Sequence, residues 1–164
     1  MVLRRIPGLR ARLAASSIPA VLQSKATPKK RPSPKVEQIR ARVEAAWTAS
    51  QQDTWKGTGP EQSGPLLVGL WAKLHEEIYE VDVVPTLATG SEWMKATVAA
   101  KRVAHRLGDV GVALEFVTWA WRAEERQERR RRSGEIDNEW RMSWQNLFLR
   151  PGTVLDFLAV RRRG

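Results

Sequence analysis

Arginine and lysine side chains that could bind phosphate groups gather in three runs of the sequence. The first lies in residues 1–36, which hold nine basic side chains and no acidic one; the first acid of the chain is Glu37. The second run is Arg129–Arg132, and the third is Arg161–Arg163. Such clusters bind polyanions by releasing the counterions of the polyanion, so their affinity depends on salt and hardly on base sequence.

The first run gives the strongest indication of a polyanionic partner. Of the 28 Lys and Arg residues, nine lie in residues 1–36, which leaves 19 against 18 acidic residues in the rest of the chain. The net charge of +10 therefore resides almost entirely in residues 1–36. The other two runs also have a structural explanation, because cations stabilise the C-terminal end of a helix. The residues that we expect to contact phosphate are Arg4, Arg5, Arg10, Arg12, Lys29, Lys30, Arg31, Arg129, Arg130, Arg131 and Arg132.

Eight tryptophans are a second candidate for nucleic-acid chemistry, because aromatic rings can stack on the bases of a single strand. Four of them fall on apolar stripes and are expected in the core: Trp47, Trp71, Trp121 and Trp144. Trp55 lies in an expected loop, and Trp119 lies off the main stripe of its helix. These two are the better candidates for an aromatic contact with a ligand, although a second packing face explains them equally well.

Catalytic and metal-binding patterns are not found in the sequence. There is no cysteine, and the two histidines, His75 and His105, are not spaced as metal ligands. His75 is interpreted as a solvated neighbour of Glu76 on a helix. Because no nucleophile motif or phosphate-binding glycine loop is present either, we expect a non-enzymatic protein without cofactor or metal.

The elements that must position these residues are helices. We expect an all-α protein, a compact bundle of about five to six helices at 36–164, behind a disordered basic arm at 1–35. Apolar residues recur at helical spacing in most of the body. The expected helices are 35–50, 66–80, 91–107, a longest one that follows Asp109 and frays into Ser133 and Gly134, one carrying Trp140 to Phe148, and a short last helix capped by Thr153. A long loop is expected at 51–65. The alternative is a helical domain with a small β-wing near 81–89.

The ends of the third expected helix are marked by specific residues. Ser91 is a candidate N-cap, and Gly108 is a candidate left-handed stop. Asp109 is expected to cap the next helix, on which Glu125 and Arg129 are spaced for an i,i+4 ion pair. The core candidates of the third helix are Trp93, Met94, Thr97, Val98, Val103, Ala104 and Leu107.

Three segments resemble parts of bacteriophage and prophage replication-associated proteins. They are TGSEWMKATVAAKRVAHRLGD (Thr89–Asp109), LEFVTWAWRAEER (Leu114–Arg126) and FLRPGTVLDFL (Phe148–Leu158). The likeness covers about residues 70–160, and the chain departs from it at Ser91, where Lys is common. The resemblance implies a role in DNA transactions of a phage or mobile element, and it carries no catalytic residue across.

Our first hypothesis is a non-catalytic nucleic-acid-binding accessory protein, with DNA favoured over RNA, in the cytoplasm of an infected or lysogenic bacterium. The arm would bind phosphates, and the body would dock a protein such as a replication factor. One alternative is a structural subunit of a ribonucleoprotein or organellar assembly, whose N-terminal segment is a transit peptide for the organelle matrix. The other is a protein-protein interaction module. No apolar run reaches the roughly 18 residues of a membrane span.

Overall fold

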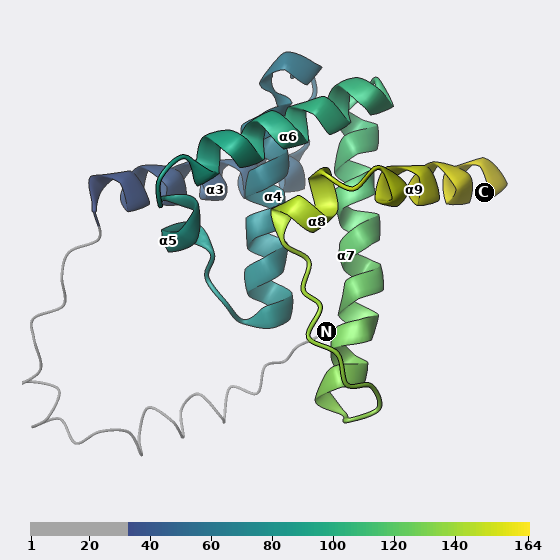
Figure 1. Cartoon of the computed structure of the whole chain (residues 1–164). Helices are drawn as coiled ribbons and strands as arrows, with labels where there is room; N and C mark the ends of the chain where they lie inside the picture. Colours follow the sequence, from purple (N-terminus) through teal and green to yellow (C-terminus); the bar gives the residue numbers. More distant parts are fainter. Residues whose placement is uncertain (1–32) are drawn as a thin grey trace, which may run out of the picture. The chain divides into compact units, whose positions relative to one another are not determined.

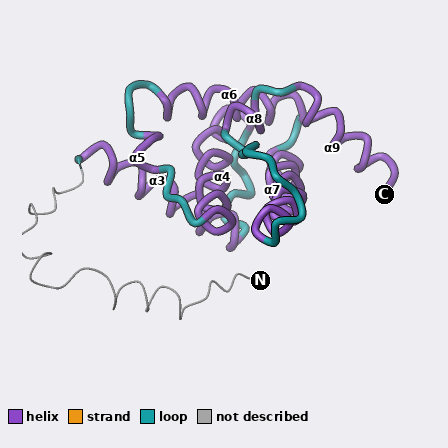
Figure 2. The backbone as a smooth tube through the Cα atoms, turned by 60° about the horizontal axis from the view of Figure 1, so that its bottom comes forward, coloured by secondary structure: helices purple, strands orange, loops and turns teal. Residues whose placement is uncertain are grey.

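The computed structural model describes residues 33–164, and this part of the chain is all-α, as the sequence predicts. It has seven α-helices, one short 3-10 helix and no strand (Figure 1, Figure 2). Residues 34–164 form one compact unit. The helices are α3 (Pro34–Gln52), η1 (Pro60–Gln62), α4 (Ser63–Tyr79), α5 (Val84–Leu87), α6 (Glu92–Leu107), α7 (Val110–Arg132), α8 (Trp144–Phe148) and α9 (Pro151–Arg163).

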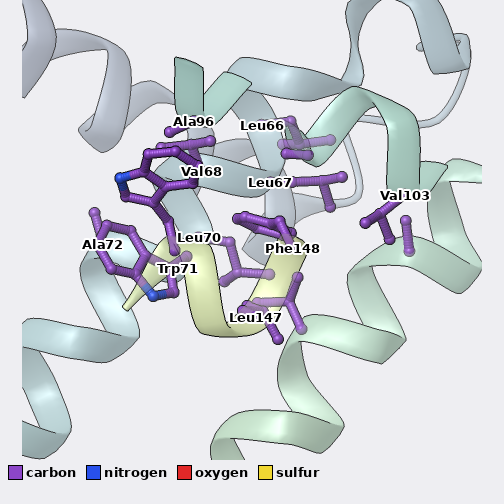
Figure 3. Close-up of a cluster of buried hydrophobic side chains, with 14 of the residues drawn as sticks. Leu66, Leu67, Val68, Leu70, Trp71, Ala72, Ala96, Val103, Leu147 and Phe148 are labelled. Atoms are coloured by element: carbon purple, nitrogen blue, oxygen red, sulfur yellow. The ribbon is translucent and has the colours of Figure 1, made fainter. Parts of the chain in front are cut away.

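Helix α4 forms the centre of the bundle, since it packs against α3, α6 and α7. Its apolar residues point in several directions, which is typical of a helix that is covered on most sides. Figure 3 shows its side chains beside those of α6 and α8. Helices α4 and α7 lie side by side, while α6 crosses the bundle near their first turns (Figure 1, Figure 2). The buried residues of α4 shown in Figure 3 are Leu66, Leu67, Val68, Leu70, Trp71 and Ala72.

Two glycines of α4 allow its neighbours to approach closely. A Cβ atom at Gly69 would collide with the Cβ of Ala46 on α3. A Cβ atom at Gly64 would lie 2.5 Å from the carbonyl oxygen of Thr97 on α6. Both helix crossings therefore depend on the absence of a side chain at these positions.

The core face of α6 is rotated relative to the predicted one. Trp93, Val103 and Ala104 are buried as expected, but Met94 is 60% and Val98 39% exposed, and Thr97 is only half-buried. The prediction of these three as core residues is wrong. The face that meets α4 consists largely of alanines, because small side chains permit the close crossing described above. These alanines are Ala96, Ala99, Ala100 and Ala104.

Local end signals were predicted with mixed success. Gly108 has the expected left-handed φ of 79°, and the side chain of Asp109 accepts a 2.9 Å hydrogen bond from the backbone N–H of Val112. The Ser91 side chain makes no capping hydrogen bond, since its backbone is not in the extended conformation that capping uses. Thr153 does not cap the last helix either. Helix α9 begins two residues earlier at Pro151, a residue suited to the first helical position.

Three connections differ from their predictions. The loop expected at 51–65 is shorter, because α3 continues to Gln52 and α4 starts at Ser63, with Pro65 tolerated in its first turn. The alternative wing near 81–89 is not present; this stretch contains the short helix α5. The helix expected from Trp140 starts only at Trp144, and Trp140 lies in a non-helical segment. No helix within residues 33–164 is long and apolar enough to cross a membrane.

Candidate nucleic-acid interface

Trp55 and Trp119, the two tryptophans singled out in the sequence, line one open hollow of about 510 Å³. We call it the tryptophan hollow. The end of α3, the turn after it, α4, α7 and α9 all contribute to it. Its lining residues are Ser50, Gln51, Asp53, Trp55, Leu70, Gly111, Leu114, Glu115, Thr118, Trp119, Arg122 and Phe157.

The Trp119 ring is held by two phenylalanines. It stacks on Phe116 of the same helix with ring centroids 6.4 Å apart, and it lies 5.5 Å from the ring of Phe157 on α9. Phe116 and Phe157 are buried, whereas Trp119 is only half-buried. The indole therefore has a packed side, as the packing interpretation expects, and a side that faces the hollow.

The Trp55 ring is positioned by the start of α7. A Cβ atom at Gly111 would lie 2.8 Å from Cη2 of Trp55 and 2.9 Å from the Asp109 carboxylate that caps the helix. Glycine at this position thus leaves room for the indole against the first turn of α7. The turn itself is closed by backbone hydrogen bonds, including one of 2.8 Å from the Thr58 N–H to the Trp55 carbonyl.

Of the charged side chains that line the hollow, one cation forms no ion pair within residues 33–164. Glu115 accepts a 3.4 Å hydrogen bond from Arg161 of α9, and Asp53 lies 3.8 Å from the ammonium of Lys56. Arg122 is exposed and forms no ion pair within residues 33–164, and the same holds for Arg126 one turn further along α7. Trp119, Arg122 and Arg126 are spaced i, i+3 and i+7, which places them on one face of the helix.

The second predicted phosphate contact, the run Arg129–Arg132, is engaged in ion pairs. Arg129 bonds to Glu125 at 3.3 Å, the i,i+4 pair predicted from the sequence, and Arg130 lies 3.2 Å from Glu135. Arg132 bonds to Glu128 at 3.1 Å, to Glu80 at 3.2 Å and to the carbonyl of Ile78 at 2.8 Å. These three side chains lie at the surface.

Arg131 is not a surface residue, so the prediction that it contacts phosphate is corrected. Its side chain is 8% exposed and donates to Glu124 at 2.8 Å and to Glu128 at 2.7 Å. It also donates to Asn138 at 2.8 Å. The hydrogen bond to Glu124 and, to a smaller extent, that to Glu128 raise the pKa of Arg131 further and keep it charged.

The carboxylate of Glu124 also belongs to a buried polar network at the ends of α4 and α7. The Tyr79 hydroxyl donates to Glu124 at 2.5 Å and accepts from the Met142 N–H at 2.8 Å. The Trp71 indole donates to the Met142 carbonyl at 2.9 Å. Burial, together with the hydrogen bond to Glu124, raises the pKa of Tyr79. The network fixes the segment before α8 and has a structural role.

His75 belongs to this buried region, which corrects its interpretation as a solvated residue. It is 9% exposed and packs edge-on against the rings of Trp71, Tyr79 and Trp121. Its Nδ1 lies 3.2 Å from the carbonyl of Val81. Burial lowers the pKa of His75, which favours the neutral ring. Among the described residues, no group of three or more His, Asp or Glu side chains could hold a metal ion.

Sequence reasoning did not single out Arg122 and Phe157, which line the hollow, or Arg126, which lies one turn further along α7. A signal was present for the two arginines, because they follow Trp119 on one helical face. A signal was also present for the buried acid: Leu114, Val117 and Trp121 form the buried stripe of α7, and the same spacing continues to Glu124.

The remaining phosphate candidates lie outside the described residues: Arg4, Arg5, Arg10, Arg12, Lys29, Lys30 and Arg31. No family model, curated protein or solved structure matches this chain.

Proposed function

We propose that this protein is a non-catalytic accessory protein that binds single-stranded nucleic acid. The observation that carries the proposal is the meeting of Trp55 and Trp119 in one hollow, next to Arg122 and Arg126, which have no partner within residues 33–164. Indole rings stack on unpaired bases, and arginines neutralise the phosphates between those bases. Base faces in a duplex are already stacked, so this arrangement suits a single strand better.

The basic residues 1–36 support the proposal independently. Their nine cations supply the salt-dependent part of the affinity, and the hollow adds the preference for exposed bases. The volume of about 510 Å³ lies in the range of sites that hold small organic groups such as one base with its sugar. In this proposal, Arg129, Arg130 and Arg132 add to the surface potential near the strand, and Arg131 does not take part.

The resemblance to replication-associated proteins gives the proposal its setting. The protein would act on DNA during replication of a phage or mobile element, in the bacterial cytoplasm, and its helical body would also dock a protein partner. No cofactor is required for this role.

The test is a fluorescence titration of the full-length chain with three oligonucleotides of equal length: single-stranded DNA, single-stranded RNA and duplex DNA. We expect the single strands to bind more tightly than the duplex, to quench tryptophan fluorescence, and to lose affinity steeply as salt rises. Equal DNA and RNA affinities would remove the DNA preference from the proposal. Affinity that is independent of salt, or no quenching at saturation, would contradict the proposal as a whole.

A matched pair of variants separates the hollow from general charge. Arg122→Glu and Arg106→Glu make the same charge change at exposed helical arginines without an ion pair within residues 33–164, but only Arg122 lines the hollow. We expect Arg122→Glu to weaken single-strand binding about tenfold more than Arg106→Glu, since one good contact is worth roughly 1.4 kcal/mol. Equal losses in both variants would mean that net charge alone drives the binding.

A further inference from the structure

A second hollow, of about 370 Å³, lies between the outer face of α6 and the end of α8. We call it the α6–α8 groove; Figure 1 shows the two helices beside each other. Its walls are Met94 and Val98, one turn apart on α6, and Leu149, which follows α8. These side chains are 60%, 39% and 50% exposed. The exposed residues of α6 that the core prediction placed wrongly therefore form an apolar surface of their own.

Trp144 lines the groove without offering a free polar atom. Its side chain is buried, and its indole N–H donates to Glu92 at 3.2 Å. The surface open to a ligand is therefore aliphatic. The charged residues that line the groove are Lys95 and Arg102, both basic, and neither side chain forms an ion pair or hydrogen bond within residues 33–164.

These features discriminate between possible occupants. Residues 1–36 of the chain are strongly basic, so Lys95 and Arg102 would repel them. A stable dimer buries roughly 800 Å² per partner, far more than three apolar side chains offer. A nucleic-acid strand gains from exposed aromatic rings, and the indole here is covered. A short segment with apolar anchors and acidic flanks complements both the walls and the rim.

We propose that the α6–α8 groove binds a short, acidic, amphipathic helix of another protein. Apolar side chains one turn apart on that helix fill the space between Met94, Val98 and Leu149, and acidic side chains on its flank face Lys95 and Arg102. This is the helix-in-groove mode of recognition. The inference names the chemistry of the protein partner in the proposed function, and it does not require that the tryptophan hollow bind nucleic acid.

The test uses the full-length chain with labelled methyl groups and a synthetic peptide as the probe. The peptide carries leucines at i and i+4 on one face and glutamates beside them; one comparison peptide has lysine for glutamate, and another has serine for leucine. We expect the acidic peptide, titrated to millimolar concentration, to shift the methyl resonances of Met94, Val98 and Leu149. The two comparison peptides should leave these resonances in place.

Exposed positions supply matched variants. Met94→Glu and Arg102→Glu should each weaken peptide binding at least about tenfold, because they remove an apolar wall or reverse a rim charge. Leu155→Glu on α9 makes the same kind of change at a side chain that is 55% exposed and outside the groove, and it should bind as the parent does. Thermal unfolding followed by circular dichroism checks that all three variants fold.

Several results would overturn the inference. The acidic peptide could leave the methyl resonances of the groove unshifted, or the lysine peptide could shift them equally. Met94→Glu and Leu155→Glu could also bind the acidic peptide equally well. Groove shifts that depend on protein concentration alone would assign the groove to a second copy, and shifts caused by an oligonucleotide would assign it to nucleic acid. Arg122→Glu separates the two proposals, since it should bind the peptide normally while losing affinity for single strands.

Discussion

The guanidinium of Arg131 and the carboxylate of Glu124 form a buried ion pair, 2.8 Å apart and 8% and 3% exposed. The pair joins the last turns of α7 to Tyr79 of α4 through the Tyr79 hydroxyl. A buried charge that loses its partner is costly, because neither water nor another cation replaces the lost interaction. The arginine-rich end of α7 thus contains one structural residue among surface residues.

Replacing Arg131 with alanine should lower the free energy of unfolding by about 3–5 kcal/mol, because Glu124 is then buried without its cation. Arg129→Ala is the matched control. It removes an exposed arginine with a single i,i+4 pair, and it should change stability by no more than about 0.5 kcal/mol. Urea unfolding of both variants measures the difference. Similar losses of unfolding free energy in the two variants would show that the buried pair stabilises the fold no more than the exposed pair does.

Acidification should destabilise the protein through His75. Burial lowers the pKa of this residue in the folded state, so below pH 6.5 the unfolded chain takes up a proton that the folded chain does not. The contribution of His75 to stability is therefore fully present above its ordinary pKa. The free energy of unfolding falls as pH decreases toward the folded-state pKa, by at most about 1.4 kcal/mol per pH unit for one proton.

The measurement is the free energy of unfolding between pH 7.5 and 5.5, a range above the ordinary pKa values of the carboxylates. His75→Gln should remove most of the slope that the parent protein shows. The groups around His75 are the rings of Trp71, Tyr79 and Trp121, the Val81 carbonyl, and the Arg141 side chain that lies over Tyr79. Parallel slopes in parent and His75→Gln would exclude this histidine as the origin.

Gly69→Ala should destabilise the bundle by about 1–3 kcal/mol, because the new methyl group overlaps Ala46 at the crossing of α3 and α4. Ala46→Gly in the same chain should restore part of the loss, since it returns the space. Gly152→Ala is the control: nothing lies within 4 Å of its Cβ position, and alanine is the better helix former. Thermal unfolding compares these variants, and a lack of rescue by Ala46→Gly would argue against a close crossing.

Gly111→Ala should weaken single-strand binding while leaving the remainder of the fold in place. The new methyl group would contact the Trp55 ring and displace it from the start of α7. We expect a changed tryptophan emission maximum and a loss of affinity of about tenfold, the size of a lost stacking contact. Unchanged emission and affinity would separate Trp55 from the proposed interface. Gly152→Ala again serves as the control.

The α7 helix shows how far sequence patterns reach. Its N-cap at Asp109 and the pair Glu125–Arg129 were predicted correctly, because a cap and an i,i+4 pair involve only neighbours along one helix. The structural role of Arg131 was not predicted, because this role depends on how deeply Glu124 is buried. That burial is created by α4 and by the segment before α8, which lie far away in the sequence.

The sequence by itself determined the helical class of the described region, the positions of its long helices and the charge asymmetry between residues 1–36 and the rest. These properties follow from apolar periodicity, local end signals and composition. Only the tertiary structure decided that the alanine face of α6 is buried while Met94 and Val98 are exposed, since both faces are apolar and the close crossing with α4 selects the smaller side chains. It also brought Trp55 and Trp119, 64 positions apart, into one hollow. Such a meeting depends on how helices pack, and no local pattern contains it.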